Sequence, residues 1–160
     1  MSSQVLTSQS SVSVFSRLLR AHSSLSRELS ARLVTEHGLT INDYEALLHL
    51  SHAEEGSLRR VDLAERLMLT PSGVTRLLDG LERQVLVAKG ACAADARVSY
   101  AVLTDAGRER LDAASCSHVG SVRALFEERY SAEELETLAA LLGRLPGAGG
   151  AETDCSECVP

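Results

Sequence analysis

The sequence predicts a mainly α-helical fold that carries one short β-hairpin. In most of the chain, apolar residues recur every three or four positions, which places them on one face of a helix. Aromatic residues make up 3% of the chain and Trp is absent, so the core must consist of Leu, Val and Ala, which suits helices. Two segments, 86–89 and 98–102, break the helical pattern on either side of a loop of small residues. These segments are the expected hairpin.

Two helices are expected in the first third of the chain. Residues 1–11 are Ser-rich and lack periodicity, so we expect a disordered arm there. A long helix is expected at about 12–37, where an apolar stripe follows one face and a glycine comes next as a C-cap. A second helix is expected to begin after Thr40 or Asn42, either of which suits an N-cap, and to end near Ala53.

Two short helices and a tight turn are expected between residues 58 and 84. The first helix covers 58–67 and the turn covers 68–70. The second helix runs from Pro71 to about Gln84, with Thr70 as its N-cap. Its apolar residues fall at i, i+3, i+4 and i+7, and its opposite face is polar. This arrangement is a helix-turn-helix, whose second helix can enter the major groove of DNA.

The hairpin follows the helix-turn-helix directly, and the two motifs together make a winged helix at about 57–104. Thr104 is then expected to cap a long helix from 105 to about 130. The segment 131–134 has the pattern of a capping box and begins a last helix, which ends near 145. Residues 147–160 are expected to form a flexible tail.

Three motifs in this order resemble the MarR family of transcription regulators. They are LTPSGVTRLLDGLER at 69–83, Asp-Ala-Arg at 95–97 and LTDAGR at 103–108. The likeness covers 12–146 as a single domain. One departure concerns the wing, where the family often has two arginines after the Asp and this chain has Ala96 in place of the first.

The resemblance implies a homodimer, in which the helices at about 12–37 and 105–145 of two chains interlock as a dimerisation region. The residues give an independent reason to expect a partner, because one winged helix cannot cover three more apolar stripes. The resemblance further implies a repressor that binds double-stranded DNA at a near-palindromic operator and is released by an effector. The two recognition helices would lie in successive major grooves, about 34 Å apart.

The charge distribution agrees with a DNA partner although the net charge is −6. Residues 56–110 contain nine basic and seven acidic side chains, a balance of +2, whereas the remainder has a balance of −8. DNA affinity depends on the local charge that faces phosphate, not on the total. Because +2 is modest, we expect salt-sensitive binding that needs two copies.

The candidate DNA-binding residues divide into three roles. Ser72, Thr75 and Arg76 are the candidates for reading bases from the second helix, with Gly73 among them. In the wing, Arg97 is expected to enter the minor groove and Asp95 to brace the loop. The residues that fit phosphate contacts are Arg59, Arg60, Arg83 and Lys89.

The candidate effector residues are scattered His, Cys and Arg side chains. Some members of the resembling family sense zinc, and others bind small aromatic acids between the dimer helices and the DNA-binding lobe. Imidazole and thiolate suit zinc, and an arginine could pair with the carboxylate of an organic effector. The alternative is that these histidines are ordinary core or interface residues. No cofactor is certain. The candidates are Arg17, Arg20, His22, His49, His52, Cys116 and His118.

Other functions are less consistent with the sequence. The pair Cys155 and Cys158 has metal or redox spacing but lies in the tail, and Cys92 lies in the wing, so we expect inert thiols. No catalytic, P-loop or dinucleotide motif occurs, which argues against an enzyme. We expect a cytoplasmic protein, since neither a signal peptide nor an apolar run of about 20 residues is present. The alternatives are a metal- or thiol-responsive repressor, or a helical interaction module without DNA binding.

Overall fold

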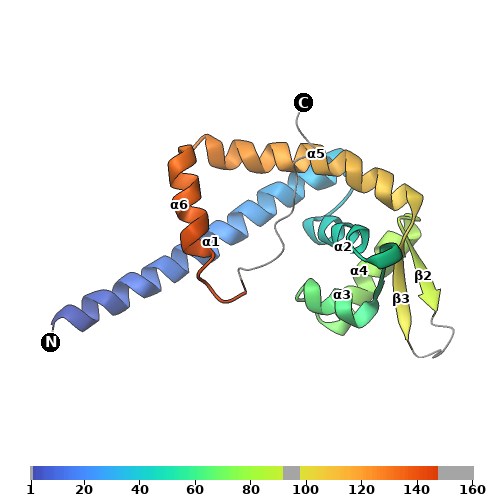
Figure 1. Cartoon of the computed structure of the whole chain (residues 1–160), viewed down its shortest axis with the longest axis horizontal. Helices are drawn as coiled ribbons and strands as arrows, with labels where there is room; N and C mark the ends of the chain where they lie inside the picture. The colour runs from blue at the N-terminus through green and yellow to red at the C-terminus, as the bar shows by residue number, and fades with distance from the viewer. Residues whose placement is uncertain (1, 92–97, 148–160) are drawn as a thin grey trace.

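The computed structural model describes residues 2–91 and 98–147 and confirms a mainly helical fold with a small sheet. In chain order the elements are α1 (Ser2–His37), α2 (Ile41–Ser51), a 3-10 turn (Glu54–Gly56), β1 (Ser57–Arg59), α3 (Arg60–Arg66), α4 (Pro71–Arg83), β2 (Val87–Ala91), β3 (Ser99–Leu103), α5 (Asp105–Glu127) and α6 (Ala132–Leu142). The long helices α1 and α5 pack together, and a lobe made of α2, α3, α4 and the sheet lies at one end of α5 (Figure 1). Within the described ranges, no helix is long and apolar enough to cross a bilayer.

Helix α1 begins at Ser2, ten residues before the start predicted at residue 12. No Gly or Pro interrupts Ser2–His37, so the helical hydrogen bonds continue through the Ser-rich segment although it lacks an apolar stripe. The structure thus includes residues 2–11 in α1, where the sequence predicted a disordered arm at 1–11. The other end of α1 matches the prediction, because Gly38 adopts φ +69 as a C-terminal cap.

The lobe contains the predicted helix-turn-helix. α3 begins at Arg60, two residues later than predicted, because residues 57–59 form β1 instead. α4 begins at Pro71 as predicted, and the hydroxyl of Thr70 caps it by accepting a hydrogen bond from the amide of Gly73 at 3.1 Å.

The sheet has three strands rather than the predicted two. Its order is β1-β3-β2, and both pairs are antiparallel. The predicted hairpin is present as β2 and β3, with Val87 opposite Leu103. β1 lies on the other side of β3 and places Arg59 opposite Tyr100. The sequence pattern does not reveal β1, because a three-residue strand is too short to show alternation.

The core lies in the lobe, with α2 at its centre. Leu47 and Leu50 of α2 are fully buried in one cluster with Leu63 of α3 and with Leu78 and Leu81 of α4. This cluster holds α4 by the apolar stripe that the sequence predicts. The polar face of α4 is thereby turned outward.

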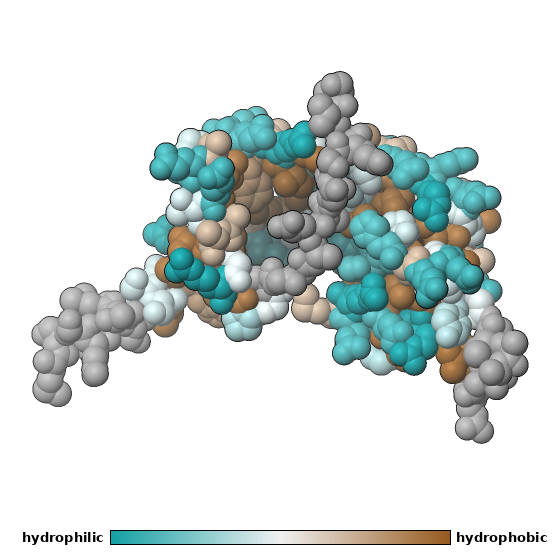
Figure 2. All heavy atoms as spheres, in the orientation of Figure 1, coloured by the Kyte–Doolittle hydropathy of each residue, from teal (hydrophilic) through white to brown (hydrophobic). Residues whose placement is uncertain are grey.

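The two C-terminal helices extend away from the lobe. Ser131 and Glu134 form the predicted capping box at the start of α6. α5 ends at Glu127, three residues before the predicted end near 130. The structure gives α6 no buried residue, and its Leu141 and Leu142 are exposed. Figure 2 shows apolar side chains gathered in the hollow between α6 and the lobe.

Candidate nucleic-acid interface

The outward face of α4 carries the predicted base-reading residues. Ser72, Thr75 and Arg76 are all exposed, whereas Val74 and Leu78 on the opposite face are buried. The helix is therefore anchored by its core stripe and presents hydroxyl and guanidinium groups to solvent. Such groups donate hydrogen bonds to guanine and adenine edges in the major groove.

The three polar side chains of this face differ in how they are held. The hydroxyl of Thr75 donates to the carbonyl of Pro71 at 2.8 Å, and Ser72 exchanges a hydrogen bond of 3.2 Å with Thr70. Arg76 makes no hydrogen bond or ion pair within the described residues. Its guanidinium is consequently the most available donor on the helix. Gly73 is half-buried, and its amide donates the hydrogen bond that the capping hydroxyl of Thr70 accepts.

Several of the predicted phosphate contacts have partners within the chain. Asp62 holds the Arg59 guanidinium in two hydrogen bonds, of 2.7 and 2.8 Å. Lys89 lies 3.2 Å from Glu82, which ties strand β2 to α4. Arg83 donates to the backbone carbonyl of its own helix at residue 79, over 3.1 Å. These cations are exposed and can therefore reach phosphate. Each already has a partner within the chain, which it must either share with the phosphate or give up.

Arg60 is placed differently from the other basic residues. Its Nη2 atom is buried and has no hydrogen-bond partner among the described residues. A pocket of about 510 Å³ between α3 and the start of α4 is lined by this arginine together with Val61, Leu69 and Thr75. An unpartnered buried guanidinium N–H favours an anionic acceptor at this position.

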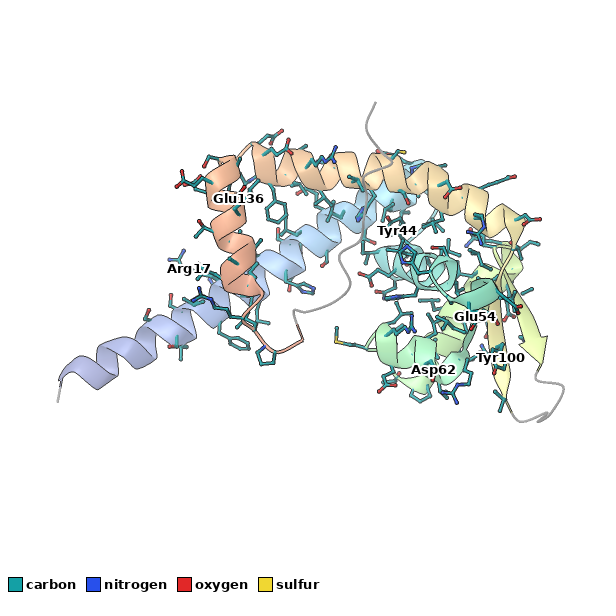
Figure 3. All side chains as sticks on the ribbon, viewed as in Figure 1. Arg17, Tyr44, Glu54, Asp62, Tyr100 and Glu136 are labelled. Carbon is teal, nitrogen blue, oxygen red and sulfur yellow. The ribbon has the colours of Figure 1, made fainter. Side chains whose placement is uncertain are left out.

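The face that bears these groups lies away from the long helices. Asp62 on α3 and Tyr100 on β3 both lie at the part of the lobe remote from α5 (Figure 3). The predicted wing residues Asp95 and Arg97, like Cys92, lie outside the described residues. Their roles therefore stay predictions.

A second group of predicted residues lies where α5 meets α2. The ring of His118 packs on that of Tyr44, with centroids 4.6 Å apart. The Tyr44 hydroxyl shares a 3.3 Å hydrogen bond with Ser115. Burial lowers the pKa of His118, and its Nδ1 atom is buried with no hydrogen-bond partner among the residues described. Burial thus favours the neutral form of the imidazole, and its Nδ1 atom is unused within the described residues.

The other histidine candidates interact with side chains of their own. Burial, followed by the charges of Arg66 and His52, lowers the pKa of His49. His22 lies near Glu45, where it partly offsets the rise that burial causes in the pKa of that carboxyl group. Arg17 of α1 lies well apart from Tyr44 (Figure 3). Arg20 belongs to the same helix.

The structure does not bring the predicted metal ligands together. No three His, Cys, Asp or Glu side chains in the described part of the chain are grouped so that they could hold a metal ion. Cys116 is exposed, although it is only two residues from the half-buried His118. Cys155 and Cys158 lie outside the described residues.

The sequence reasoning missed three side chains that shape these sites. Asp62 and Glu82 hold basic residues of the interface, and Tyr44 covers His118. The i, i+3 spacing of Arg59 and Asp62 is a signal that could have revealed the first pair. The contact of Tyr44 with His118 joins residues far apart in the chain, so no local pattern predicts it.

Comparison with known proteins identifies the family. The sequence model of the MarR family matches residues 37–98. The transcriptional repressor YetL of Bacillus subtilis is 32% identical over 108 residues, which cover 68% of this chain and 64% of YetL. The chain thus spans somewhat less than two thirds of the length of that relative.

Two solved structures from Streptomyces coelicolor extend the likeness to the whole fold. Sco5413, a MarR family transcriptional regulator, is 35% identical with a TM-score of 0.72, over 82% of this chain and 89% of that one. Sco3205, a MarR family regulator solved in complex with DNA, is 27% identical with a TM-score of 0.73, over 80% of each chain. These relatives are regulators rather than enzymes, in agreement with the sequence prediction. The chain belongs to the MarR family of transcriptional regulators.

Proposed function

We propose that this chain binds double-stranded DNA as a homodimer and represses transcription from a near-palindromic operator. The observation that carries the proposal is the outward face of α4, where Arg76 is exposed and without a partner in the described residues beside Ser72 and Thr75. A core-anchored helix with free donors fits the major groove. The DNA complex of the related Sco3205 supports the same partner for this chain.

The apolar surface of the long helices supports the homodimer. Val12, Phe15 and Leu19 of α1 are at least half exposed, as is Leu141 of α6. A single soluble chain rarely leaves so much apolar surface in contact with water. A second copy that covers both helices would bury it and hold two lobes at a fixed spacing.

A small organic effector at the contact of α2 with α5 is the third part of the proposal. Tyr44 and His118 join the lobe to a dimer helix, and the buried Nδ1 atom of His118 has no partner among the described residues. A ligand with an apolar body and one hydrogen-bonding group would suit this place. Its binding would shift the lobe relative to α5 and so lower DNA affinity. Benzoate should then release the operator complex of the wild type but not that of His118→Leu.

A mobility-shift titration with the DNA upstream of the protein's own gene tests the central proposal. We expect a discrete complex that an unrelated duplex does not displace, with an affinity that falls steeply as salt is raised. If every duplex is bound alike, or none is bound, repression at an operator is excluded. If none is bound, the helical interaction module without DNA binding would be the better account.

A further inference from the structure

The end of α4 is joined to the start of α5 by an unusually dense set of contacts. The hydroxyl of Thr104 donates to the carbonyl of Val85 at 2.7 Å and accepts from the amide of Gly107 at 3.0 Å. The amide of Thr104 also donates to the carbonyl of Leu86 at 3.2 Å. One residue therefore binds the segment that leaves the recognition helix and also caps the helix that leads to the proposed dimer interface.

The backbone at this junction leaves little room for adjustment. Val85 adopts φ +61, a conformation in which a β-branched side chain is strained. Gly107 is buried, and a Cβ atom there would overlap the carbonyl oxygen of Leu86. The first turn of α5 thus lies directly on the backbone that follows α4. Neither side of the junction can shift without breaking one of these contacts.

A small rotation at the junction would be large at the DNA. Arg76 precedes Val85 by nine residues, which corresponds to roughly 13 Å along a helix at about 1.5 Å per residue. A tilt of about 10° would then move its guanidinium by roughly 2 Å, enough to break a hydrogen bond to a base edge. The core fixes α4 within the lobe, so this junction, together with the contact of α2 with α5, sets the angle between the lobe and α5.

We infer that Thr104 is a positioning residue for sequence reading, which acts on α4 through Val85 and Leu86. The inference rests on the proposed function, because it assumes that α5 holds two lobes against one operator. Its structural alternative is simple: Thr104 does no more than cap α5. The two roles use different atoms of the hydroxyl group, since capping needs the oxygen as an acceptor and positioning needs the O–H as a donor.

Substitutions at Thr104 separate these roles. Thr104→Ser keeps both hydrogen bonds, Thr104→Val removes both, and Thr104→Asp keeps the acceptor for the Gly107 amide but loses the donor to Val85. Thr40→Val is the matched control, because Thr40 caps α2 through the same geometry and makes no contact with this junction. The measured quantity is the dissociation constant for a scrambled duplex divided by that for the operator. An added charge changes both constants alike, so its effect cancels in this ratio.

We expect Thr104→Val and Thr104→Asp to lower this ratio by about tenfold, the discrimination carried by one good base contact. Thr104→Ser should retain the ratio, and Thr40→Val should retain it despite a comparable loss of thermal stability. A wild-type ratio in Thr104→Asp would overturn the inference, as would an equal loss in Thr40→Val. If Thr104→Val does not fold, the ratio measured for Thr104→Asp tests the inference by itself. A wild-type protein that binds both duplexes equally would instead refute the proposed function.

Discussion

A β-branched side chain occupies the left-handed backbone region at Val85, directly after the C-cap of α4. Glycine is the usual residue at such a C-terminal position because it has no Cβ to clash. The chain needs this conformation to reverse direction between α4 and β2. Val85 is also 66% exposed, so its side chain gains little from burial to offset the strain.

Val85→Gly should therefore stabilise the protein. Relief of the left-handed strain, at about 1–2 kcal/mol, exceeds the extra entropy of glycine in the unfolded chain, so a net gain of about 0.5–1 kcal/mol is expected. Urea unfolding measures the difference. The matched control is Val61→Gly in α3, at a side chain that is 67% exposed, which should lose up to about 0.5 kcal/mol. Equal losses in both variants would refute the strain at Val85.

His49 and His118 make stability depend on pH. Burial lowers the pKa of both imidazoles below their ordinary value of 6.5, so the fold favours their neutral forms. Their contribution is fully present above the unfolded pKa and is lost as pH falls through 6.5 towards the lowered folded pKa values. The free energy of unfolding should therefore fall on acidification from neutral pH. The variant His49→Gln/His118→Gln should show a flatter profile, and a wild-type stability that rises on acidification would contradict this cause.

At the scale of elements, α4 shows what a sequence pattern can predict. Its start at Pro71, its cap and its buried stripe all follow from local spacing, and all are confirmed. β1 and the first ten residues of α1 do not follow, since one is three residues long and the other lacks a stripe. Pairing between distant residues, as at Tyr44 and His118, depends on tertiary packing and leaves no local signature.

Two glycines of α5 should respond to substitution in opposite ways. At Gly107 a Cβ would overlap the Leu86 carbonyl, so Gly107→Ala should cost about 2–4 kcal/mol. At Gly120 a Cβ would have no neighbour within 4 Å, so Gly120→Ala should gain about 0.5–1 kcal/mol from helix propensity. Thermal unfolding of both variants is the measurement. A small loss of stability in Gly107→Ala would mean that the first turn of α5 does not lie tightly on the Leu86 backbone.

The recognition helix and the wing should differ in the kind of DNA contact they make. Arg76→Ala should cost about 1–3 kcal/mol per half-site and relax preference at one operator position, because a guanidinium can bind a guanine edge. Arg97→Ala should weaken binding to all sequences and reduce the salt slope by about one phosphate equivalent per subunit. Salt series with operator and scrambled duplexes measure both. If Arg76→Ala weakened both duplexes equally while Arg97→Ala affected only the operator, the two assignments would be reversed.

At the scale of the whole molecule, charge and apolar surface divide the chain into two functions. The excess of positive charge lies in residues 56–110, whereas the remainder has a balance of −8. Most of that negative charge lies in residues 111–160, and the three glutamates of α6 disfavour DNA contact by that helix. α1 itself carries four arginines and two glutamates, so only the exposed apolar side chains of α1 and α6 suggest that a second copy covers them. Because the DNA-facing charge of one lobe is small, we expect tight binding to need two lobes on one operator.

Hydroxyl-radical footprinting of the operator complex, with its stoichiometry from light scattering, tests this arrangement most directly. A dimer that inserts two α4 helices should protect two segments related by two-fold symmetry, with their centres about 10 base pairs apart. The complex should contain two chains per duplex. Protection of a single segment by one chain, or of none, would contradict the account.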